Sequence, residues 1–100
     1  MILTKDNWTK EDYNKFLEYL YRQQDLKFKE FSKKIILDET MIGVRTPILK
    51  NIAKEIFKGN YKSYLEISSN NTYEEKLIYG LIVGNIKEFN KEKEQKGYTR

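Results

Sequence analysis

Cysteine and histidine are both missing from this chain of 100 residues, which also has a single proline and a single tryptophan. Without cysteine there is no disulfide scaffold, no thiolate nucleophile and no cysteine-built zinc site. Without histidine there is no Ser-His-Asp or Cys-His triad and no imidazole acid–base chemistry. Any chemistry must therefore come from carboxylates, lysines, tyrosines or backbone groups. Among these we assign no catalytic residue, and we expect no metal site and no cofactor.

Long apolar runs are missing as well, since the longest are three or four residues, such as residues 81–83. Runs of that length are far too short to span a membrane, and the first residues lack the apolar core of a signal peptide. We therefore expect no membrane partner and a location in the reducing cytoplasm. The net charge of +4 is divided evenly between the two halves, which permits a nucleic-acid partner without demanding one.

The apolar residues recur at helical spacing in the first third of the chain. Thr9 and Asp12 resemble a capping box, in which each side chain bonds the backbone of the other residue. The residues that follow on one helical face are Tyr13, Phe16, Leu17 and Leu20. Asp25 is expected to cap a second helix, whose apolar positions are Leu26, Phe28, Phe31, Ile35 and Ile36. One helix broken near residues 23–25 is the alternative.

The middle of the chain contains the clearest helix signal. Thr46 supplies a hydroxyl for capping, and Pro47 follows at the first helical position, where a missing N–H costs nothing. An apolar stripe then runs to Lys58, and Gly59 is the expected end. Asn60 is expected to cap a short helix that contains Tyr61, Tyr64, Leu65 and Ile67.

The last predicted helix begins at a full capping box over residues 72–75 and extends to about Phe89. Gly80 and Gly84 lie inside it, and each costs about 1 kcal/mol relative to alanine, so a close helix contact is expected to compensate. No segment alternates with a period of two. The sequence therefore predicts an all-α fold of about five helices, with one domain over residues 1–89 and a solvated, frayed tail over residues 90–100.

Three groups of residues are candidates for function. Trp8, Phe28 and Phe31 stand near lysines and could stack on bases, although their spacing is also that of core residues. Glu74 and Glu75 form a carboxylate pair, but acids in a first helical turn favour the helix dipole and the capping role.

The segment Gly-Val-Arg-Thr-Pro, residues 43–47, is the most specific of the three. A permissive glycine, an arginine and a helix N-terminus can present a cation and free N–H groups to a phosphate. We expect DNA phosphate contacts at Arg45, Thr46 and Lys50, with Lys33 and Lys34 as outer contacts. The alternative is a loop whose only task is to position the next helix.

The arrangement resembles the N-terminal part of the AlkD-like DNA alkylation repair family. The segments that carry the resemblance are residues 12–20, 28–34, 43–47, 49–56 and 73–84. The resemblance implies HEAT-like helical repeats, duplex DNA along a basic concave face, and excision of alkylated purines by an acid and tryptophans on later repeats. The matching region ends near Phe89, before such a segment, and the only Asp-Asn-Trp stands at residues 6–8, ahead of the first family helix.

The expected function is accordingly that of the N-terminal part of an alkylpurine DNA glycosylase-like protein, with weak DNA binding and no catalysis. A non-catalytic helical-repeat module that binds proteins is the alternative, and a structural fragment of a degraded gene is a third. Because roughly three repeats are needed for a stable stack, we also expect a homodimer through residues 73–89.

Overall fold

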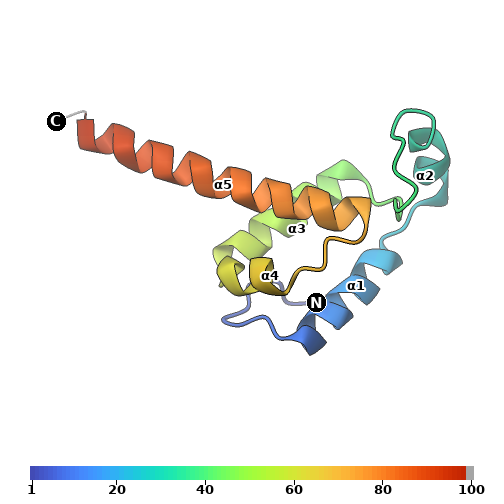
Figure 1. Ribbon diagram of the computed structural model, residues 1–100, viewed down its shortest axis with the longest axis horizontal. Coiled ribbons are helices and arrows are strands. Elements are labelled where there is room, and N and C mark those ends of the chain that lie inside the picture. The colour runs from blue at the N-terminus through green and yellow to red at the C-terminus, as the bar shows by residue number, and fades with distance from the viewer. Residues whose placement is uncertain (99–100) are drawn as a thin grey trace.

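The computed structural model describes the backbone of residues 1–98 and the side chains of residues 1–90. Within residues 1–98 there are five helices and no strand, which confirms the predicted all-α class (Figure 1). The helices are α1 (Lys10–Arg22), α2 (Leu26–Ser32), α3 (Thr46–Lys58), α4 (Tyr61–Ile67) and α5 (Tyr73–Tyr98). A helical-repeat arrangement stays a prediction.

Helix α3 is the centre of the molecule. Its most extensive helix contact is with α5, and α4 packs against both α3 and α1. Helix α2 and the loop after it lie at the end of the molecule opposite the C-terminal half of α5, which projects beyond the other helices (Figure 1). The chain therefore has a packed centre and a protruding element at each end.

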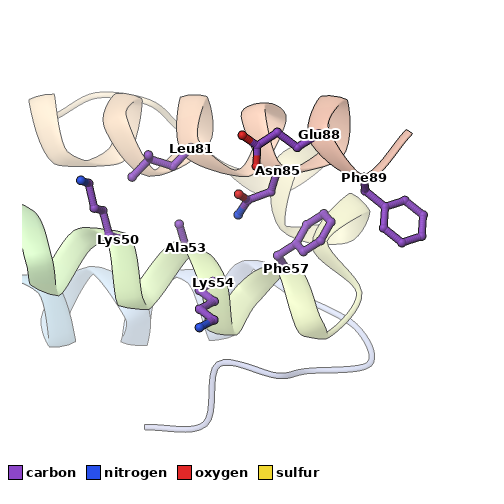
Figure 2. Close-up of a pocket in the computed structure, with 8 residues that line it drawn as sticks. All are labelled: Lys50, Ala53, Lys54, Phe57, Leu81, Asn85, Glu88 and Phe89. Carbon is purple, nitrogen blue, oxygen red and sulfur yellow. The ribbon is translucent and has the colours of Figure 1, made fainter. Parts of the chain in front are cut away.

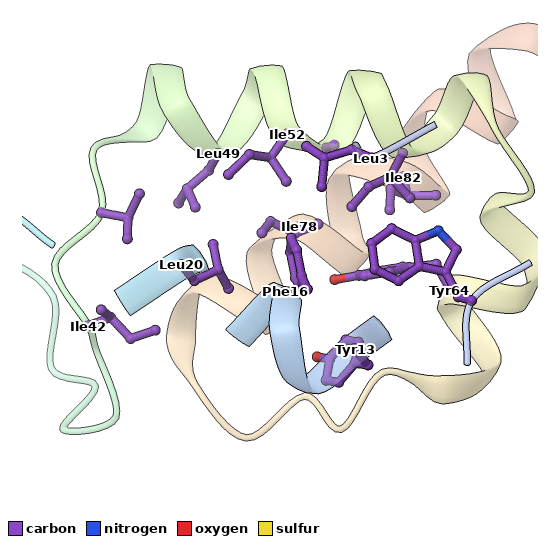
Figure 3. Packing of buried hydrophobic residues seen from close by; sticks show 14 residues of the cluster. Leu3, Tyr13, Phe16, Leu20, Ile42, Leu49, Ile52, Tyr64, Ile78 and Ile82 are labelled. Atoms are coloured by element: carbon purple, nitrogen blue, oxygen red, sulfur yellow. The ribbon is translucent and has the colours of Figure 1, made fainter. Parts of the chain in front are cut away.

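The core is built from one face of each packed helix (Figure 3). Its fully buried large side chains are Phe16, Leu20, Ile42, Val44, Leu49, Ile52, Ile56, Tyr64, Ile78 and Ile82. Trp8 meets Phe16 and Tyr64 edge to face, with ring centroids 5.6 and 5.2 Å apart. Burial of each such side chain stabilises the fold by about 1.5–3 kcal/mol.

Local capping signals account for most helix starts. The Thr9 hydroxyl accepts from the Asp12 N–H at 3.1 Å, and the Asp12 carboxylate accepts from the Thr9 N–H at 3.1 Å. The Asp25 side chain caps α2, so α1 and α2 are two separate helices. The Asn60 side chain caps α4. These predictions are confirmed.

The start of α3 differs by one residue from the prediction. The N-cap is Arg45, not Thr46, and no side chain makes a capping hydrogen bond there. Arg45 has an extended backbone, with φ −64° and ψ 141°, and its carbonyl accepts from the N–H groups of Ile48 and Leu49. Because this carbonyl already begins the helical ladder, Thr46 takes the first helical position and Pro47 the second.

Helix α2 is shorter than predicted. It ends at Ser32, and a last turn closes as the Ser32 carbonyl accepts from Ile35 and Ile36. Helix α2 turns its Lys29 side toward the loop before α3, where it approaches Gly43 so closely that a Cβ there would lie 2.7 Å from the Lys29 Cβ. Ser32 is buried on this side, whereas Leu26, Phe31 and Ile35 are exposed. The apolar spacing therefore does not mark a core face here.

Helix α5 is longer than predicted and continues past Phe89 to Tyr98. Residues 90–96 are mainly lysine, glutamate and glutamine, which favour helix, and no glycine or proline interrupts them before Gly97. The side chains of the predicted solvated tail lie outside the described residues from position 91. None of the described helices is both long and apolar enough to cross a bilayer.

The expected close helix contact at Gly80 and Gly84 is also absent within the described chain. No neighbouring heavy atom lies within 4 Å of the position that a Cβ would take at either glycine. Both positions face open space on the side of α5 that is turned away from α3, so no contact among the described residues compensates for their low helix propensity.

Candidate nucleic-acid interface

Arg45 connects the beginnings of α2 and α3. Its Nε donates to the Asp25 Oδ2 at 3.0 Å, and its guanidinium carbon lies 5.3 Å from the centre of the Phe28 ring. The backbone hydrogen bond from Phe28, followed by the hydrogen bond from Arg45, lowers the pKa of Asp25 below its ordinary value. Part of the guanidinium is thus used within the chain, and Phe28 is half-buried beneath it.

Lys50 lies in a groove between α3 and α5 with a volume of about 650 Å³ (Figure 2). The groove is lined by Lys50, Ala53, Lys54, Phe57, Leu81, Asn85, Glu88 and Phe89. The Lys50 side chain extends from α3 toward α5, whereas Lys54 points away from α5 (Figure 2). Among the side chains that the structure describes, neither ammonium group takes part in an ion pair.

Lys33 and Lys34 lie in the turn after α2, in a segment that we call the tip, residues 31–37. Both lysines are exposed, and the Lys33 Nζ lies 3.9 Å from the Glu30 carboxylate, a long and solvated contact. Lys33 borders a surface hollow with Ile36 and Leu37, which is separate from the α3–α5 groove.

The five predicted phosphate contacts therefore fall into three places. Arg45 and the exposed Thr46 mark the start of α3, Lys50 lies in the α3–α5 groove, and Lys33 and Lys34 lie on the tip. The structure adds Lys54 beside Lys50. Sequence reasoning missed this lysine although it is one helical turn after Lys50, a spacing that brings side chains to neighbouring positions.

Glu74 makes a long-range structural contact that the sequence did not reveal. Its side chain is fully buried, and its two carboxylate oxygens accept the backbone N–H groups of Ile42, Gly43 and Val44 at 2.8, 2.9 and 3.2 Å. The capping role expected for it is thus wrong. Instead the Glu74 carboxylate binds three backbone amides of the segment that leads into α3, which lies 30 to 32 positions earlier in the sequence.

Glu75 has the predicted capping role and a second one. Its carboxylate accepts from the Thr72 N–H at 2.8 Å, while the Thr72 hydroxyl accepts from the Glu75 N–H at 3.2 Å. The same carboxylate accepts from the hydroxyls of Tyr13 and Ser69. Glu75 therefore joins α1, the turn before α5 and α5 itself.

Hydrogen bonding decides the titration of Glu75. Burial by itself raises its pKa, but the bonds from Ser69, Tyr13 and Thr72 outweigh that effect, so the pKa lies below its ordinary value. Burial, followed by the bond to Glu75, raises the pKa of Tyr13. Because the pKa of Glu75 is lower in the folded chain than in the unfolded chain, its ionised carboxylate stabilises the fold at pH values above the ordinary glutamate pKa. This contribution is lost as the pH falls through the lower, folded-state pKa.

Trp8, considered for base stacking, and the carboxylate pair Glu74 and Glu75 are occupied within the fold. Trp8 is only 3% exposed and belongs to the core, so its ring cannot face a base. The carboxylates of Glu74 and Glu75 are both satisfied by donors of the chain itself. No group of three or more acidic or other metal-ligating side chains among the described residues is placed to hold a metal ion.

Comparison with protein-family models, with curated proteins and with solved structures found no match to this chain. The resemblance to the AlkD-like family thus rests on the residues of the sequence alone.

Proposed function

We propose that this chain is the N-terminal part of an AlkD-like DNA alkylation repair protein located in the reducing cytoplasm. It binds duplex DNA weakly through phosphates and does not catalyse base excision. The observation that carries the proposal is the pair Lys50 and Lys54, whose ammonium groups have no carboxylate partner among the described side chains, in a chain of net charge +4. Arg45, Thr46, Lys33 and Lys34 are the remaining proposed contacts.

We do not assign catalysis to this chain, because excision of an alkylated purine needs an anion beside the developing positive charge and a dry aromatic wall around the sugar. The single tryptophan is in the core, and the two buried glutamates accept hydrogen bonds from the protein. We expect no release of alkylated purines from methylated duplex DNA.

Replacing Lys50 with alanine is expected to lower the salt dependence of duplex DNA binding. Each phosphate contact releases condensed counterions, so loss of one reduces the slope of log K against log salt by about one. Fluorescence anisotropy with a labelled duplex at several salt concentrations measures this slope. The effect should be the same for any DNA sequence, because phosphates carry no sequence information.

The matched control is Lys15→Ala, which removes the same charge from α1, where Lys15 lies 3.6 Å from Glu11. Its slope should stay at the wild-type value. If Lys50→Ala and Lys15→Ala give equal salt slopes, DNA binding depends only on the overall charge of the chain and not on Lys50. Absence of salt-dependent binding would refute the proposal.

A homodimer, and with it a protein-interaction role, is the second candidate. Two separate features of α5 favour it: Gly80 and Gly84 have no neighbour on the side turned away from α3, and Phe89, which borders the α3–α5 groove, is 56% exposed. Exposed apolar surface along a helix favours association, and glycines let a second helix approach closely.

Sedimentation at micromolar concentration is expected to give a mass near twice the 12.1 kDa of the chain. Phe89→Glu should return it to a monomer, because Phe89 is exposed and its replacement leaves the core intact. Leu26→Glu places the same charge at an exposed position outside α5 and should leave the mass unchanged. A monomer throughout the concentration range would exclude this candidate.

A further inference from the structure

The tip carries exposed apolar side chains between charges of opposite sign. Phe31 is 64% exposed, Ile35 69% and Leu37 93%. From Lys33 to Glu39 the chain has two lysines, three apolar residues and two acids, in that order. Side chains as apolar as these are normally buried, so their exposure together indicates a surface that a partner covers.

The charges around this surface balance. Residues 25–39 contain four lysines and four acids, so the segment has no net charge. A hollow of about 470 Å³ is bordered by Lys33, Ile36, Leu37, Asp38 and Glu39, which brings a base, apolar residues and both acids around one depression. A partner of one charge sign, such as a phosphate or an anionic membrane, would meet its own sign at the acids. The partner that fits must therefore carry both signs.

The two ends of the charged segment remain available to such a partner. Among the described side chains, Lys34 and Glu39 take part in no ion pair, and both are exposed. Asp38 is partly used within the chain, because its carboxylate accepts from the Thr40 N–H at 2.9 Å and lies 3.5 Å from the Lys76 Nζ. Glu39 is therefore the acid that is free to meet a partner.

The segment that carries the tip is held firmly at its base. The Asp25 N–H donates to the Gly43 carbonyl at 2.8 Å, and the Gln24 side chain donates to the Ile42 carbonyl at 2.7 Å. The buried Glu74 carboxylate binds the amides of the same segment. A surface presented in this way loses little conformational entropy when a partner covers it.

We propose that the tip binds a second copy of this chain, with the two copies related by a two-fold axis that passes near Ile36. A two-fold axis reverses the direction of the segment and pairs each residue with a counterpart in both directions. Reversal about Ile36 brings Lys33 of one copy to Glu39 of the other. The same reversal brings Lys34 to Asp38. Opposite charges therefore meet at both ends of the contact.

The apolar residues form the centre of the same contact. Reversal about Ile36 places Ile35 of one copy opposite Leu37 of the other, so the most exposed apolar side chain of the tip is covered. Phe31 adds to the apolar surface on the α2 side. The contact thus has an apolar centre and a polar rim, which is the usual arrangement in protein interfaces.

This contact goes beyond the proposed function, since neither Lys50 nor Lys54 takes part in it. It lies at the end of the molecule opposite the C-terminal half of α5, so it is separate from association through Phe89 (Figure 1). Few residues form it, and small interfaces belong to weak and transient complexes. Pairing through the tip is therefore expected only above micromolar concentration.

Sedimentation of the Phe89→Glu chain from about 10 µM to 1 mM tests the pairing, because this background removes association through α5. The mass should rise with concentration toward twice 12.1 kDa. Lys33→Glu or Glu39→Lys, added singly, should each weaken the pairing about tenfold, since the two-fold axis creates a like-charge pair at both ends. An equal mixture of these two variants should restore it, and so should the double variant K33E/E39K.

Lys15→Glu is the matched control, because it makes the same charge change on α1 and should leave the pairing unchanged. Lys50→Ala should also leave it unchanged, so the pairing and the proposed DNA binding fail independently. A monomer at every concentration, or a mixture of Lys33→Glu and Glu39→Lys that associates no better than each alone, would overturn the proposal. Binding of a monomeric chain to phosphatidylserine vesicles, abolished by Leu37→Ala, would assign the tip to lipid and overturn it as well.

Discussion

Replacing Glu74 with alanine is expected to lower the free energy of unfolding by about 3–5 kcal/mol, a large part of what a domain of this size has. The carboxylate is fully buried and accepts the amides of Ile42, Gly43 and Val44. Alanine leaves these three donors without an acceptor in a region that excludes water, and each unpaired buried group costs about 1–3 kcal/mol. Urea unfolding followed by circular dichroism measures the loss.

Two further variants separate the lost hydrogen bonds from other effects. Glu74→Gln keeps the shape and one acceptor oxygen but turns an NH2 group toward an amide, so its stability should lie between those of wild type and Glu74→Ala. Glu66→Ala removes an exposed carboxylate from α4 and should change stability by less than about 0.5 kcal/mol. If Glu74→Ala and Glu66→Ala have similar stabilities, the amide cradle is not a stabilising element.

Helix positions followed from local signals because the groups that decide them are neighbours in sequence. The capping pairs Thr9 with Asp12 and Thr72 with Glu75 are three residues apart, and both form as predicted. The end of α3 at Lys58 likewise follows from Gly59. Where several helix formers follow one another without a break, as in the last part of α5, the absence of apolar residues does not end the helix.

The site depends on contacts that no local pattern contains. Glu74 reads as an ordinary first-turn acid, and only the fold brings the amides of residues 42–44 to it. Phe31 has core spacing in the sequence, but the side of α2 that meets the chain is decided by the close approach of Gly43 to Lys29. Lys33 and Lys50 lie in separate hollows, the first in the turn after α2 and the second between α3 and α5.

Glycine to alanine substitutions at Gly43 and Gly80 are expected to have opposite effects on stability. Gly43 has a φ of +102°, which L-residues rarely adopt, and its Cβ would lie 2.7 Å from the Lys29 Cβ. Strain and overlap together should lower the stability of Gly43→Ala by about 2–4 kcal/mol. At Gly80 a Cβ meets open space, so Gly80→Ala should raise stability by about 0.5–1 kcal/mol through its higher helix propensity.

Thermal and urea unfolding of the two variants test this contrast, since the covalent change is the same methyl group in both. Gly43→Ala should also disturb α2 and the tip, because α2 packs closely against Gly43, and weaker DNA binding should accompany its lower stability. Gly80→Ala has a second reading in sedimentation. If a partner helix packs closely at Gly80, the added methyl group weakens association even as it stabilises the helix, so a more stable chain with a lower mass would locate the dimer contact. A Gly80→Ala chain less stable than wild type at concentrations where both are monomeric would contradict the open face of α5.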